Sequence, residues 1–117
     1  MSHWVYLQYD DGRTCRVPPH REGATYPLGG EGEDEAELSV TYNYEAHYRR
    51  VLHPDGLRWL HGRHARDCIE ALERAVRELG TTPSENYWDP TEGNAGYALS
   101  ILLSWARLHP DARFHVG

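Results

Sequence analysis

The sequence contains no lysine, since all twelve of its basic residues are arginine. This absence excludes the lysine Schiff base that several classes of enzyme use as a covalent intermediate. Only two cysteines are present, Cys15 and Cys68, which is too few for a scaffold held by disulfides. We therefore expect both cysteines to be reduced and to behave as small hydrophobic residues.

Long apolar stretches are also missing, because no run approaches the roughly 18 residues of a membrane-spanning helix. The N-terminal sequence MSHWVYLQYDDG has no basic segment followed by an apolar one, so we expect no secretion signal. Both absences favour a soluble, cytoplasmic protein. The net charge of −6 argues against direct nucleic-acid binding, which relies on a basic surface.

Catalytic motifs are absent as well. The chain has no Gly-x-Ser-x-Gly, no P-loop and no Gly-x-Gly-x2-Gly. Two cysteines and eight histidines are present, but nothing in the sequence places a nucleophile beside a base. We therefore expect a protein that is not an enzyme and needs no cofactor.

The first third of the chain predicts strands and a loop within a single domain of 117 residues. Residues 1–17 are expected to form a hairpin, because WVYLQY is rich in β-formers and Asp11-Gly12 is typical of a type I′ turn. Residues 18–35 lack periodicity and are expected to form a long loop rich in Pro, Gly and acids. A third strand is expected at 36–42, where Leu38, Val40 and Tyr42 alternate with Ser39 and Thr41.

The remaining residues predict helices. Asn43 is expected to cap a short helix over 44–52, followed by turn residues at 53–56. A middle helix is expected over 61–80, with an apolar stripe and Gly80 at its end. A last helix is expected from residue 93 or 94 to 109, and a short edge strand at 112–116. The predicted fold is α+β: a small antiparallel sheet packed against two main helices and one short helix.

Two segments carry the residues of a candidate ligand site. VTYNYEAHY (40–48) and NYWDPTEGNAGYAL (86–99) both place Tyr or Trp beside Asn at the start of a helix. If they meet, they form an aromatic, amide-lined pocket suited to a nucleobase or a peptide, with the last helix capped by Thr91 or Asn94. Packing alone also explains them. The candidate residues are Tyr42, Asn43, Tyr44, Tyr87, Trp88, Thr91 and Asn94.

Two glycines in the second segment extend this hypothesis. Gly93 and Gly96 leave backbone N–H groups unshielded, so that a small anion or a carbonyl group can approach them.

Two other clusters remain as alternatives. His61, His64 and Cys68 have a spacing that supplies three zinc ligands from one helix face, although Cys68 also fits the apolar stripe. The run GGEGEDEAE at 29–37 holds five acids and predicts a solvated loop, which is a second place to look for a binding surface.

The chain resembles a group of small proteins of tailed bacteriophages and prophages, for which no activity is assigned. The resemblance lies in a Thr-Tyr-Asn stretch, a Leu-x-Gly start to the middle helix, a Tyr-Trp-x-Pro-Thr-x-Gly-Asn-Ala segment and a final His-Pro-Asp. The first 35 residues lie outside it. The matching residues are Thr41, Tyr42, Asn43, Leu60, Gly62, Tyr87, Trp88, Pro90, Thr91, Gly93, Asn94, Ala95, His109, Pro110 and Asp111.

This resemblance implies a function by binding, because small acidic phage proteins without catalytic motifs often act in that way. We expect a counter-defence protein that sequesters a nucleotide-type signal or occludes a host protein. A small enzyme or zinc-supported module built on His61, His64 and Cys68 is one alternative. A regulatory or structural phage protein that acts as a homo-oligomer is the other.

Overall fold

The computed structural model of the protein describes residues 1–20 and 33–117. Its strands are β1 (Ser2–Gln8), β2 (Arg16–His20), β3 (Glu33–Glu35), β4 (Glu37–Thr41) and β5 (Arg113–Val116). Its α-helices are α1 (Glu45–Val51), α2 (Ile69–Leu79) and α3 (Glu92–Leu108). Its 3-10 helices are η1 (Tyr42–Tyr44), η2 (Gly56–Leu60) and η3 (Ala65–Asp67).

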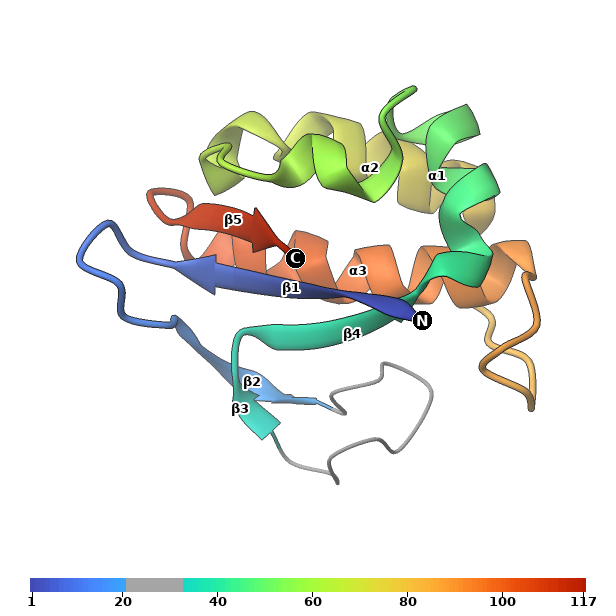
Figure 1. The fold of residues 1–117 in the computed structure, drawn as a ribbon, viewed down its shortest axis with the longest axis horizontal. Helices are drawn as coiled ribbons and strands as arrows, with labels where there is room; N and C mark the ends of the chain where they lie inside the picture. The colour runs from blue at the N-terminus through green and yellow to red at the C-terminus, as the bar shows by residue number, and fades with distance from the viewer. Residues whose placement is uncertain (21–32) are drawn as a thin grey trace.

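The larger sheet has the strand order β4-β1-β5, and both outer strands are antiparallel to β1 (Figure 1). Val5 on β1 pairs with Leu38 on β4, and Leu7 pairs with Phe114 on β5, so four buried side chains meet at the centre of the sheet. Figure 1 shows α3 running behind this sheet, and α3 packs against α2. The predicted α+β fold is confirmed.

The turn after β1 differs from the predicted type I′ turn. The Gly12 N–H donates to the Tyr9 carbonyl, and the Tyr9 N–H donates to the Arg13 carbonyl, both at 2.9 Å. These bonds enclose a three-residue loop in which Gly12 has a φ of 89°, the left-handed conformation that such loops require. The hairpin continues only as far as Cys15, whose N–H donates to the Leu7 carbonyl.

β2 then leaves β1 and pairs with β3 in a separate two-stranded sheet. The loop predicted at 18–35 is therefore wrong at both ends, and its residues 21–32 lie outside the described part of the chain. His20 ties this second sheet to the rest of the protein. Its Nε2–H donates to the Glu37 carbonyl at 2.9 Å, and its ring lies 5.0 Å from the ring of Trp105.

The strand predicted at 36–42 is confirmed as β4, and residues on both of its faces are buried. Ser39 and Thr41, which alternate with Leu38 and Val40, are also buried, whereas Tyr42 is exposed. Tyr87 lies at the free edge of β4, where its hydroxyl group donates to the Ser39 carbonyl and accepts from the Thr41 N–H. A distant segment thus pairs with the edge of β4 that does not face β1.

The short helix predicted at 44–52 is present as η1 and α1, but Asn43 does not cap it. Thr41 caps η1 instead, because its backbone is extended and its hydroxyl oxygen accepts from the Asn43 N–H at 3.2 Å. The predicted turn at 53–56 is confirmed by the Gly56 N–H, which donates to the His53 carbonyl at 2.8 Å.

The middle helix begins at Ile69 rather than at residue 61. Gly62 has a φ of 80°, and His64 is extended and forms a β-bridge with Arg113. Neither conformation belongs to an α-helix. Gly80 ends the helix as predicted, with a φ of 75°.

The last helix, α3, and the edge strand β5 lie within a residue or so of their predicted positions. The Thr91 hydroxyl oxygen accepts from the Asn94 N–H at 3.1 Å, which confirms Thr91 as the cap. No helix among the described residues combines the length and apolar character needed to cross a membrane.

Candidate binding site

The two segments rich in rings and amides meet in space. The Asn43 Nδ2–H donates to the Trp88 carbonyl at 2.9 Å. The Tyr44 hydroxyl group donates to the carbonyl of Tyr87, and the rings of Tyr44 and Tyr87 lie 5.6 Å apart. Residues more than forty positions apart in the sequence therefore lie together. We call the buried side chains of Tyr44, Tyr87 and Asn94 the Tyr–Asn cluster.

The tyrosines of this cluster are buried and act as hydrogen-bonding groups. The Tyr87 hydroxyl group lies 2.8 Å from the Thr41 nitrogen and 3.1 Å from the Ser39 carbonyl oxygen. Burial raises the pKa of both Tyr44 and Tyr87, so both hydroxyl groups stay protonated at neutral pH. The Tyr87 phenol joins the segment before α3 to β4, and the Tyr44 phenol joins it to η1, so both have a structural role.

Asn94 is the most fully used side chain of the cluster. It is buried, and its Oδ1 accepts from the Ser84 N–H at 2.8 Å. Its Nδ2 donates to the Ser84 hydroxyl and to the carbonyls of Asn86 and Asp89, at 2.9, 3.0 and 3.1 Å. The two hydrogens of Nδ2 are shared among these three acceptors, so both donors are used within the protein and Asn94 holds the 84–89 segment in place.

The two glycines expected to admit an anion or a carbonyl are approached by the protein's own carbonyl groups. A Cβ atom added to Gly96 would overlap the carbonyl oxygen of Gly80, and one added to Gly93 would overlap that of Thr82. These glycines allow the start of α3 to pass close to the chain after α2, which is packing rather than ligand access.

Two of the predicted site residues point a ring outward. Tyr42 is 42% exposed and Trp88 is 44% exposed. The Tyr42 ring lies 4.5 Å from the ring of His3, and the Trp88 ring lies 5.0 Å from the ring of Tyr87, so both rings have a fixed neighbour. Five of the seven predicted residues therefore make hydrogen bonds within or between the two segments and the strand beside them: Asn43, Tyr44, Tyr87, Thr91 and Asn94. The other two, Tyr42 and Trp88, keep their rings at the surface.

The three residues of the alternative zinc site do not share a helix face. His61 lies in a turn before Gly62, and its Nδ1 accepts from the Val116 N–H at 3.0 Å. Cys68 is buried, and burial raises the pKa of its thiol to about 12, which disfavours the thiolate that zinc requires. Within residues 1–20 and 33–117, no group of three His, Cys, Asp or Glu side chains is placed to hold a metal ion.

Metal removal tests this arrangement directly. We expect incubation with EDTA to leave the melting temperature and the circular dichroism spectrum unchanged, because the described contacts of His61 and Cys68 are hydrogen bonds and packing. Elemental analysis of the purified protein checks the same point. Unfolding in EDTA would restore the zinc hypothesis, since structural zinc contributes folding energy outright.

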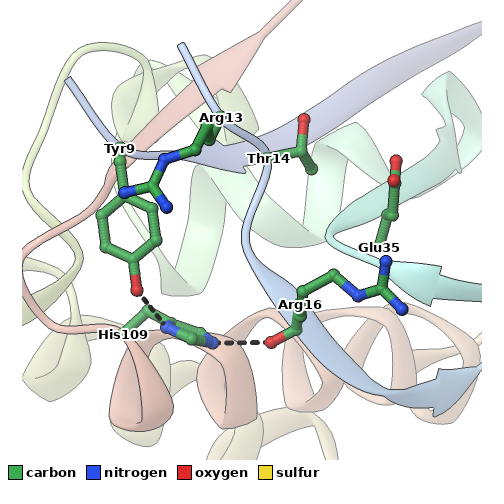
Figure 2. Close-up of a pocket in the computed structure, with 6 residues that line it drawn as sticks. All are labelled: Tyr9, Arg13, Thr14, Arg16, Glu35 and His109. Carbon is green, nitrogen blue, oxygen red and sulfur yellow. Dashed lines mark hydrogen bonds between the residues drawn. The ribbon is translucent and has the colours of Figure 1, made fainter. Parts of the chain in front are cut away.

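Sequence reasoning missed an open cavity of about 440 Å³ at the other end of α3 (Figure 2). The turn after β1 supplies three of the lining residues, and β2, β3 and the end of α3 supply one each. The sequence hinted at this cavity only through Tyr9, Arg13 and Arg16, which lie close together around the first turn. The lining residues are Tyr9, Arg13, Thr14, Arg16, Glu35 and His109.

No family model, curated protein or solved structure matches the chain.

Proposed function

We propose that the protein is a non-catalytic binding protein that covers a basic surface of a partner protein. Its contact surface, here called the ring surface, consists of Tyr42, Trp88, Glu85 and Asp89. The observation that carries the proposal is the exposure of two large rings on segments whose own polar groups are bonded internally. The ring surface is thus held in shape before any partner arrives.

Trp and Tyr suit such a role because they supply large contact areas with few rotatable bonds. They are enriched among the residues that dominate the energy of protein interfaces. The Asn43 bond to the Trp88 carbonyl and the Thr41 bond to the Tyr87 hydroxyl fix the backbone beneath them. A contact surface that is already ordered loses less entropy on binding.

Charge indicates the chemistry of the partner. Glu85 and Asp89 flank Trp88 and are both exposed, and the whole chain carries a net charge of −6. A partner with arginine or lysine at its surface gains from both features, because a cation also binds the face of an indole ring. Complementary charge of this kind accelerates association and selects the partner.

The Tyr–Asn cluster gives less support to a nucleotide-type ligand. Asn94 and Tyr44, which were expected to face such a ligand, use their polar atoms on the protein's own backbone. Opening the cluster for a ligand would leave these buried groups unpaired, at a cost of about 1–3 kcal/mol each. Occlusion of a host protein in a counter-defence role is therefore the branch of the phage hypothesis that we propose.

Site-specific photo-crosslinking tests the proposal. A photoreactive phenylalanine analogue at position 88 is expected to give one discrete adduct in a bacterial lysate, whose partner is then identified by mass spectrometry and purified. The same analogue at Leu108, which is 54% exposed on another part of the surface, is the control and is expected to give none.

The yield of the crosslinked adduct must also fall when the negative charges of Glu85 and Asp89 are removed. We expect the double variant Glu85→Gln, Asp89→Asn to give less adduct and to make the yield of adduct less dependent on salt concentration. The control Glu70→Gln on α2 is expected to change neither quantity. An adduct at twice the chain mass of 13.5 kDa would instead indicate self-association. Equal labelling from positions 88 and 108 would contradict the proposal.

A further inference from the structure

The cavity beside the first turn is separate from the ring surface and has a fixed wall. The Tyr9 hydroxyl group lies 2.7 Å from His109 Nδ1, and His109 Nε2 lies 2.7 Å from the Arg16 carbonyl oxygen (Figure 2). A carbonyl oxygen only accepts, so Nε2 carries the proton and Nδ1 accepts from Tyr9. His109 thereby joins the end of α3 to both β2 and the turn.

The protonation state of Tyr9 supports this arrangement. Partial burial raises the pKa of the phenol, so the hydroxyl group stays protonated and continues to donate to His109. The chain of hydrogen bonds thus runs from Tyr9 through His109 to the Arg16 carbonyl. It holds three elements around the cavity without a ligand.

The cavity presents charges of both signs. Arg13 and Arg16 reach its edge from the turn and from β2, and Glu35 lines it from β3 (Figure 2). Asp11 bonds to the Nε of Arg13, and Asp34 bonds to an Nη of Arg16. These ion pairs are exposed, and exposed pairs contribute little, so an incoming carboxylate can replace either aspartate at small cost.

A flat surface is also available within the same cavity. The Arg13 guanidinium lies over the Tyr9 ring, with its central carbon 5.2 Å from the ring centre. Stacking of this kind leaves the outer face of the guanidinium for a second planar group. The volume of about 440 Å³ lies within the range of small-molecule sites.

We propose that this cavity binds a zwitterionic small molecule, an amino acid with a planar side chain. Its carboxylate pairs with Arg13 and Arg16, its ammonium group lies toward Glu35, and its ring stacks on the Arg13 guanidinium. A dianion such as a phosphate monoester fits less well, because Glu35, Asp11 and Asp34 surround the two guanidinium groups. This inference is independent of the ring surface.

Three probes with the same phenyl ring separate the charge requirements. Phenylalanine carries both charges, benzoate only the negative one and benzylamine only the positive one. In an NMR titration of the full chain, phenylalanine is expected to shift the resonances of Arg13, Thr14 and Arg16 at the lowest concentration. Benzoate is expected to need about ten times more, which corresponds to 1.4 kcal/mol.

Matched variants complete the test. Arg13→Gln and Glu35→Gln are each expected to weaken phenylalanine binding about tenfold, the effect of one charge-assisted contact. Arg74→Gln, which removes a guanidinium from α2, is expected to leave it unchanged. Equal binding of benzoate and phenylalanine, equal effects of all three variants, or no shift with any probe would each overturn the proposal.

Discussion

Gly96→Ala is expected to destabilise the protein by more than about 3 kcal/mol, the upper end of the usual cost of overpacking. The added Cβ would overlap the Gly80 carbonyl oxygen and lie 2.9 Å from the Leu79 Cβ. Backbone atoms cannot move aside as a flexible side chain does, so α2 and α3 would have to separate. Chemical denaturation of the purified variant gives the change in the free energy of unfolding.

The sign of the change in the free energy of unfolding shows whether Gly96 is tightly packed. In an ordinary helix interior, replacing glycine by alanine stabilises by about 1 kcal/mol, because alanine has the higher helix propensity. The control is Gly117→Ala, where nothing lies within 4 Å of the added atom, and no change is expected. If Gly96→Ala were neutral or stabilising, α3 would not pass Gly80 as described.

Leu72→Ala is the second large effect, with an expected cost of about 2–5 kcal/mol. Leu72 lies on α2 with its side chain fully buried, so truncation loses hydrophobic burial and leaves a cavity. The matched control is Leu108→Ala, the same truncation at a side chain that is 54% exposed. We expect it to cost less than about 0.5 kcal/mol. Equal melting temperatures for the two variants would contradict the burial of α2.

Local sequence patterns predict the segments whose signals lie close together in the chain. Thr91, Glu92 and Pro110 delimit α3 without reference to any other part of the protein. Gly80 ends α2 for the same reason. Where a helix start depends on a distant strand, the prediction fails. His64 bridges Arg113 on β5, and this pairing rather than the apolar stripe delays α2 until Ile69.

The candidate site shows the same division. The two segments were expected to meet, and the Asn43 bond to Trp88 and the Tyr44 bond to Tyr87 join them. The sequence could not say which way each polar group faces. Asn94 turns its amide onto the 84–89 backbone, and Tyr87 turns its hydroxyl group onto β4. Only the three-dimensional arrangement separates these structural side chains from the exposed rings.

The Tyr9–His109 cavity lay beyond prediction for a different reason. Tyr9 and His109 are 100 residues apart, and no spacing rule relates a residue after a first strand to one at the end of a last helix. The hairpin predicted at 1–17 and the loop predicted at 18–35 also concealed the pairing of β2 with β3, the strands that carry Arg16 and Glu35. A cavity built from a turn, two strands and the end of a helix leaves no motif in the sequence.

We propose that Tyr42 and Trp88 are exposed for a partner rather than for stability. The most direct measurement is the affinity of the partner identified by crosslinking for wild-type protein and Trp88→Ala, determined by isothermal titration calorimetry beside the melting temperature of each. We expect Trp88→Ala to weaken binding at least about thirtyfold, the effect of losing a hot-spot side chain, with little change in melting temperature. Leu108→Ala is expected to bind as wild type does. A Trp88→Ala variant that melts early yet binds with unchanged affinity would contradict the claim and would show that the ring serves packing alone.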